Sequence, residues 1–170
     1  MSMQTDVKQS RLTQTGWIVQ GPCRIKGVSL RNSTSAVGRV FLFDTSTTPV
    51  TATYAQSTTT VTVTSTAHGL STGDWVGIGY VPDGSQRSAT CGQYQITKVD
   101  ANSFTITDPN STTVSSTTTC YYVTGSGQWL YVKGLSAADQ FINYELIPGQ
   151  GIRAKQKVYT IMSSSVQSCI

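Results

Sequence analysis

Apolar and polar residues alternate with a period of two along most of this chain, and the 3.6-residue period of an amphipathic helix does not recur. The runs with this period are bounded by Gly, Pro, Asn and Ser, as strands are. They include GWIVQG, CRIKGVSLR, GRVFLFDT, TTTVTVTST, DWVGIGYV, GQYQITKVD, GQWLYVKGL and KVYTIM. A helix is expected at most as one turn at LSAADQF (135–141). The alternation therefore predicts an all-β chain.

The run FINYELI (141–147) predicts a strand with two different faces. One face carries Phe141, Asn143, Glu145 and Ile147, and the other carries Ile142, Tyr144 and Leu146, so we expect the strand to bury one of its sides. The IPGQGI that follows predicts a tight turn, because proline presets φ and the two glycines accept positive φ.

Composition supports the strand prediction. Ser and Thr make up 48 of the 170 residues, whereas only 12% of residues are charged. The β-branched side chain of Thr fits a pleated surface. We therefore expect a surface covered by hydroxyl groups.

The charge balance divides the chain into two parts. Residues 1–54 and 126–170 hold ten basic and four acidic side chains, a net charge of +6, whereas residues 55–125 hold two basic and four acidic ones, a net charge of −2. Thr- and Ser-rich stretches mark both borders. We predict a β-sandwich, jelly-roll-like host domain (1–54 plus 126–170) with a small β-barrel module (55–125) inserted into one of its surface loops.

The stretch TAHGLSTGD (66–74) holds the only histidine of the chain, six residues before an acid. Hydrolytic catalysis by His68 and Asp74 would need a nucleophile and an oxyanion pocket, and no pattern marks either. The turn interpretation gives structural roles to four residues: Gly69 and Gly73 reverse the backbone, Leu70 enters the core and Asp74 caps turn amides. We therefore predict a structural turn, no catalytic residues and no enzymatic activity.

The segment from Thr60 to Thr107 resembles a small β-barrel module of tailed-phage virion proteins, named after a half-domain of ubiquitin-activating enzymes. The motif that carries the resemblance is AHGL, GD and V, followed after a variable loop by G-x-Y-x-I, VD, N and F. The resemblance implies a structural barrel. It does not imply the activity of the modification enzymes, whose catalytic cysteine lies outside this module.

The flanking parts resemble short virion-associated proteins of marine tailed phages, including phages of cyanobacteria. The shared elements are MQTDVK at 3–8, the G-x-V-x-L-x-D strand at 38–44 and PGQGI at 148–152; the end of the chain, SSSVQSCI, departs from the aromatic-glycine tail of those proteins. The resemblance implies a non-enzymatic capsid decoration or cement protein, located in the virion after synthesis in the host cytoplasm. A tail, neck or fibre component and a carbohydrate-binding adhesin are the alternatives.

Two sets of side chains are candidates for binding. Docking on the major capsid protein or another virion protein is expected through basic residues that alternate outward on host strands, because such charges orient a complex. These are Arg24, Lys26, Arg39, Arg153, Lys155 and Lys157. An adhesin would stack sugars on exposed aromatic rings, for which the candidates are Trp75, Tyr80, Tyr94, Tyr121 and Tyr122.

Other classes of partner have less support from the sequence. The four cysteines lack metal-binding spacing and one histidine cannot complete a zinc set, so no metal or cofactor is expected. Reduced thiols are expected in a reducing cytosol, with a Cys91–Cys120 disulfide left open. No 18-residue apolar run or signal segment occurs, so no membrane partner is expected. The short RAKQK cluster does not predict nucleic-acid binding. Closed symmetry is the default for small virion proteins, and a homo-oligomer such as a trimer is expected.

Overall fold

The computed structural model describes residues 11–32, 37–135, 143–163 and 166–169, and within these ranges the chain is all-β, without a helix. The predicted fold class is thereby confirmed. The helical turn expected at 135–141 lies almost wholly outside the described residues. The strands are β1 (Gly16–Val19), β2 (Cys23–Ile25), β3 (Gly27–Asn32), β4 (Gly38–Thr45), β5 (Val50–Thr64), β6 (Trp75–Tyr80), β7 (Gly92–Gln95), β8 (Thr97–Lys98), β9 (Ser103–Thr124), β10 (Gln128–Leu135), β11 (Asn143–Leu146), β12 (Ile152–Ala154), β13 (Lys157–Met162) and β14 (Val166–Cys169).

Two sheets from the two ends of the chain share one hydrophobic core. One sheet has the strand order β1-β13-β4-β10 and the other the order β11-β3-β14. Val28 and Leu30 of β3 pack in the same buried cluster as Val40 and Leu42 of β4. The two sheets therefore face each other across this core, as in a sandwich.

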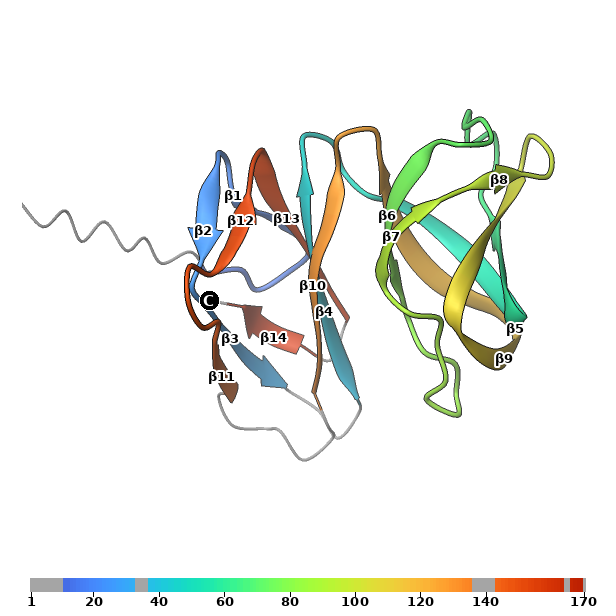
Figure 1. The fold of residues 1–170 in the computed structure, drawn as a ribbon. Coiled ribbons are helices and arrows are strands. Elements are labelled where there is room, and N and C mark those ends of the chain that lie inside the picture. Colours follow the sequence, from blue (N-terminus) through green and yellow to red (C-terminus); the bar gives the residue numbers. More distant parts are fainter. Residues whose placement is uncertain (1–10, 33–36, 136–142, 164–165, 170) are drawn as a thin grey trace, which may run out of the picture.

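A two-stranded ribbon of β2 and β12 forms the end of this part of the molecule (Figure 1). Its strands are antiparallel, with Arg24 opposite Arg153 and Cys23 opposite Ala154. Cys23 and Ala154 belong to the sandwich core, whereas both arginines are exposed. The ribbon thus covers the core with one face and presents the other to solvent.

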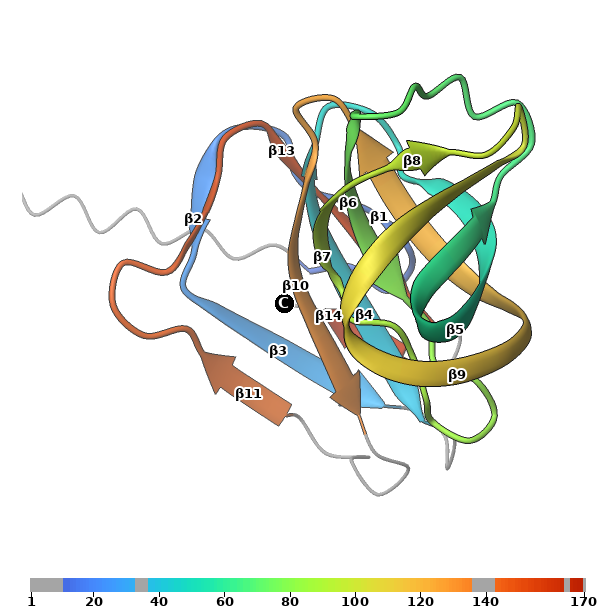
Figure 2. The same ribbon diagram turned by 45° about the vertical axis from the view of Figure 1, so that its right-hand side comes forward.

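The middle of the chain forms a curled sheet with the order β5-β9-β6-β7, to which β8 adds by pairing with β9 (Figure 2). Its side chains enclose a second core, in which Val61 and Val63 of β5 pack with Phe104 of β9. The strand order leaves the outer strands β5 and β7 unpaired with each other, so the expected barrel is a curled, incompletely closed sheet. We call this part the curled lobe.

The chain enters and leaves the curled lobe side by side, because Val50 at the start of β5 pairs with Tyr122 near the end of β9. Adjacent ends are the condition under which an insertion is tolerated in a surface loop. The predicted first border, between residues 54 and 55, falls inside β5, whereas the second, between 125 and 126, falls in the turn before β10. The division into two domains stays a prediction.

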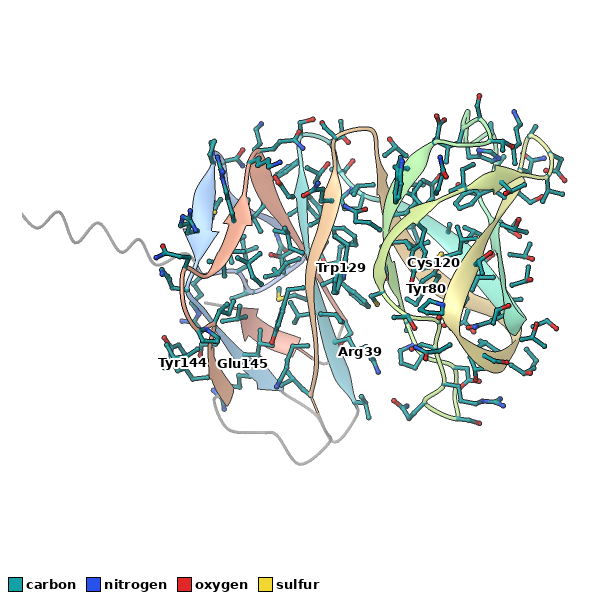
Figure 3. All side chains as sticks on the ribbon, in the orientation of Figure 1. Arg39, Tyr80, Cys120, Trp129, Tyr144 and Glu145 are labelled. Atoms are coloured by element: carbon teal, nitrogen blue, oxygen red, sulfur yellow. The ribbon has the colours of Figure 1, made fainter. Side chains whose placement is uncertain are left out.

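Strand β4 is buried on both faces, which explains its continuous apolar run. Val40 and Leu42 face the sandwich core, whereas Phe41 and Phe43 belong to a third cluster with Val123 of β9 and partly buried Trp129 of β10. Figure 3 shows Trp129 on the side of the sandwich that faces the curled lobe. This third cluster joins the two parts of the molecule.

Of the two sides of FINYELI, the one that carries Glu145 and Ile147 is the more buried. Tyr144 and Leu146 are 61% and 68% exposed, whereas Glu145 and Ile147 are half-buried. Glu145 pairs with Lys133 of β10 at 2.7 Å, and Tyr131 is also a hydrogen-bonding partner of its carboxylate. The strand therefore turns its acid toward β10 and its large apolar side chains outward.

Candidate docking surface

Four of the six predicted docking residues lie together on the β2–β12 ribbon. Arg24 and Arg153 are directly opposite each other, and Lys26 and Lys155 follow one residue beyond their strands in the same alternation. All four are exposed. Like charges opposite each other destabilise a strand pair, so this arrangement is not explained by folding alone. We call these four residues the cationic ribbon.

The turn at 148–151 holds two of these cations in place. Arg24 donates to the carbonyl of Gln150 at 3.2 Å, and the Lys26 ammonium donates to the carbonyl of Gly149 at 2.8 Å. Gly149 and Gly151 have φ values of 65° and 73°, which confirms the turn expected from IPGQGI. In the described part of the chain, neither cation forms an ion pair with a carboxylate.

A buried carboxylate anchors the other strand of the ribbon. Asp44, at 1% exposure, accepts hydrogen bonds from the backbone N–H groups of Lys155 (2.7 Å) and Gln156 (2.8 Å). These amides lie between β12 and β13 and have no strand partner there. Asp44 therefore fixes the path of the chain at Lys155 while the lysine side chain stays exposed.

The remaining two predicted docking residues lie elsewhere. Lys157 stands over the ring of Trp17, 5.4 Å from its centroid, a distance at which the ring face attracts a cation. Arg39 lies half-buried on β4, on the side toward the curled lobe (Figure 3). Neither belongs to the cationic ribbon.

The stretch around His68 has the geometry of a turn. The His68 Nδ1 accepts from the Leu70 N–H at 3.0 Å, and its Nε2 lies 3.0 Å from the Asp100 carbonyl. These contacts place the proton on Nε2 and occupy both ring nitrogens with backbone groups. Gly69 and Gly73 have φ values of 68° and 97°.

The neighbouring polar side chains complete the same turn. Asp74 accepts from the Ser71 N–H at 2.8 Å, and Asn102 accepts from the Ala67 N–H at 2.9 Å. Leu70 is buried in the core of the curled lobe. The motif therefore joins two loops and contributes one side chain to the core, in the roles that the sequence predicted for it.

The five aromatic candidates for glycan stacking are not one surface. Tyr80 and Tyr122 are 0% and 1% exposed in the core of the curled lobe, so their ring faces are closed to a ligand in this fold. Figure 3 shows Tyr80 inside this lobe. Tyr94 is half-buried and donates to the Thr90 carbonyl at 2.7 Å, and Tyr121 packs in the third cluster. Trp75 is 57% exposed and is the candidate whose ring is most open to solvent.

The thiols described by the structure are free. Cys91 and Cys120 both contact the core of the curled lobe without forming a disulfide, and Cys23 is also a free thiol. Burial raises the pKa of all three. No cluster of three or more His, Cys, Asp or Glu side chains suited to a metal occurs among the described residues. The described part also contains no helix long and apolar enough to cross a membrane.

A scan against protein-family models found no match, and a search of curated proteins found none either.

Sequence reasoning missed three features of this surface and its surroundings. It did not assign a role to Asp44, whose position at the end of a strand is the only local signal for a capping carboxylate. It did not separate Arg39 from the other basic residues. It also did not find the contact between the two parts of the molecule, although two glycines in DWVGIGY mark it.

Proposed function

We propose that this chain is a non-enzymatic structural protein of a tailed-phage particle that docks through its cationic ribbon on an acidic protein surface, most simply the capsid shell. The observation that carries the proposal is the ribbon itself. Arg24 and Arg153 stand opposite each other, and no described carboxylate neutralises them. An acidic partner surface would relieve their mutual repulsion.

The position of the ribbon supports one orientation of the docked chain on the particle. The ribbon lies at the end of the molecule opposite the curled lobe (Figure 1). A chain docked by the ribbon would therefore point the curled lobe, with its net charge of −2 over residues 55–125, away from an acidic surface. This arrangement suits decoration of a shell, and the resemblance to virion-associated proteins points to the same class.

The test is co-sedimentation of the recombinant chain with bare capsids across a salt series. The double variant Arg24→Glu, Arg153→Glu should bind more weakly than the parent chain at low salt. The deficit should narrow near 0.5 M salt, where the Debye length falls to roughly 4 Å. The matched control is Arg31→Glu, Lys98→Glu, which makes the same change of net charge at exposed positions away from the ribbon.

Equal loss of binding in both double variants would indicate a response to net charge and refute docking through the ribbon. Unchanged binding in the ribbon variant would refute it too. Imaging of the particle with the labelled chain then separates decoration from the alternative of a tail, neck or fibre protein. Label over the whole shell supports decoration, and label confined to the tail axis supports the alternative.

A carbohydrate-binding adhesin is the second candidate, and the exposure of Trp75 favours it. Trp75 begins β6 on the curled lobe, and its ring is 57% exposed. Sugars stack on such rings. If this function is correct, Trp75→Ala should abolish binding to host-cell glycans on an array while leaving capsid co-sedimentation intact. Unchanged glycan binding in Trp75→Ala, or none in the parent chain, would refute it.

A further inference from the structure

A pocket of about 170 Å³ opens where the sandwich and the curled lobe meet. Its walls come from β4 and the end of β13 on one side, and from β9 and the loop after β6 on the other. The lining residues are Val37, Arg39, Phe41, Val81, Pro82, Gln86, Tyr121, Ile161 and Ser163.

The pocket combines apolar walls with one cation. Phe41, Val81, Pro82 and Ile161 supply hydrocarbon surface, and Tyr121 adds a ring that packs against Phe41 with centroids 5.7 Å apart. Arg39 is the only lining residue with a formal charge. An apolar pocket with one convergent charged group is the usual form of a small-ligand site.

The guanidinium of Arg39 has an unmet hydrogen-bonding group. Its Nε is buried, and no acceptor contacts it within the described residues. Neither of the two ion pairs in that part of the chain includes Arg39. Burial lowers the pKa of this guanidinium, and the nearby Cys91 and Tyr54 offset this effect only in part. A buried donor without a partner is unfavourable unless a ligand satisfies it.

The outer wall of the pocket is held in shape before any ligand arrives. Asp83 accepts from the backbone N–H groups of Ser85 and Arg87, both at 2.8 Å, and pairs with the Arg87 guanidinium at 2.9 Å. Within this loop Gln86 has a φ of 61°, which is strained for a residue other than glycine. A wall fixed in this way loses little freedom when a ligand binds.

The size of the pocket limits the ligand. A cavity of about 150 Å³ is enough to hold benzene, whereas pockets for drug-sized ligands measure roughly 300–1,000 Å³. A volume of about 170 Å³ therefore suits one ring or one branched chain and excludes an oligosaccharide. The acceptor that best matches a guanidinium fork is a carboxylate.

We propose that this pocket binds small monocarboxylates with an aromatic or branched apolar body. The carboxylate accepts hydrogen bonds from the Arg39 guanidinium, and the body lies against Phe41, Val81 and Ile161. The site is separate from the cationic ribbon, so it does not depend on the docking function proposed above.

The test is calorimetric titration of the full chain with benzoate as the probe. Benzamide keeps the ring and removes the charge, and acetate keeps the charge and removes the ring. Benzoate should bind at least ten-fold more tightly than either analogue. In the variant Arg39→Met, benzoate affinity should fall at least ten-fold. The control variant Arg31→Met removes the same charge from an exposed position and should leave benzoate affinity unchanged.

Two checks keep the result decisive. A thermal melt shows whether the variant Arg39→Met stays folded. We expect it to fold, because the Nε that it loses has no hydrogen-bond partner. The Arg39 backbone N–H also keeps its hydrogen bond to the Ser163 hydroxyl at 3.0 Å. If Arg39→Met does not fold, Val81→Trp, which fills the pocket from the opposite wall, takes its place and should abolish binding. The proposal is overturned if benzoate fails to bind the parent chain at millimolar concentration, if benzamide binds equally well, or if Arg31→Met weakens binding as much as Arg39→Met.

Discussion

Replacement of Asp44 by Ala should lower the free energy of unfolding by about 2–3 kcal/mol. Asp44 is 1% exposed, and its two carboxylate oxygens accept from the amides of Lys155 and Gln156. An amide left without an acceptor costs about 1–3 kcal/mol. Both of these hydrogen bonds are part-buried, so water reaches the amides in the variant and each loss lies toward the lower end of that range. For a chain of 170 residues this corresponds to a melting temperature lower by roughly 4–12 °C.

Urea unfolding followed by circular dichroism measures this loss, and two further variants show its origin. Asp44→Asn keeps one acceptor oxygen and should lose less than Asp44→Ala. Asp74→Ala removes an exposed carboxylate that accepts one amide hydrogen bond and should lose less than about 1 kcal/mol. A loss below 1 kcal/mol in Asp44→Ala, or an equal loss in Asp74→Ala, would contradict the argument from burial.

Two further predictions follow from side chains in the curled lobe. His68→Asn should be tolerated better than His68→Ala in thermal melts, because an Asn oxygen can still accept from the Leu70 N–H two residues on, as in an Asx-turn; equal melting temperatures would refute the turn role. The free energy of unfolding should also fall as the pH rises from about 10 to 12. Burial raises the pKa of Tyr94 to about 12, whereas a tyrosine in the unfolded chain has a pKa of about 10. The unfolded chain therefore releases the Tyr94 proton at lower pH than the folded chain, and this favours unfolding. Urea midpoints between pH 9 and 12 measure this decline, which should be smaller in Tyr94→Phe; a midpoint constant through pH 11.5 would refute it.

The turn chemistry of this chain was predictable because it depends on residues close in sequence. Gly69, Gly73, Gly149 and Gly151 all adopt positive φ where the local pattern required it. Strand periodicity was equally visible, as in β5, where Val61 and Val63 are buried and Thr62 and Thr64 are exposed. Such features need no knowledge of the partner strand.

The face of β11 could not be predicted, because it depends on a neighbour from elsewhere in the chain. Hydrophobic alternation alone favours burial of Tyr144 and Leu146. The ion pair with Lys133 holds Glu145 on the inner side, and this contact also lowers the pKa of Glu145. The apolar pattern of a four-residue edge strand is too weak to oppose such contacts.

The grouping of the basic residues was predictable only in part. The two-residue alternation of the sequence correctly predicted outward faces for four of them, Arg24, Lys26, Arg153 and Lys155. The pairing of β2 with β12 then decided that the four lie together, and this pairing joins segments from opposite ends of the chain. Arg39 follows the same two-residue alternation in its strand. The curled lobe covers part of that strand, however, and the sequence alone does not reveal this contact.

The contact between the two parts of the molecule rests on a glycine stripe in β6. The sequence VGIGY places Val76, Ile78 and Tyr80 on the face that fills the curled lobe and Gly77 and Gly79 on the opposite face. Added Cβ atoms would collide with the Trp129 backbone N at the first glycine and lie 2.6 Å from the Phe41 ring at the second.

Glycine normally weakens a strand, so two of them on one face indicate a close approach by another element. The sequence reveals this stripe but not its partner. Because β6 lies directly on β4 and β10, packing rather than a linker sets the direction of the curled lobe relative to the cationic ribbon. If the ribbon docks as proposed, the same packing determines where the lobe points on the particle. It also forms the walls of the Arg39 pocket, so substitution of either glycine should disturb the pocket without touching the ribbon.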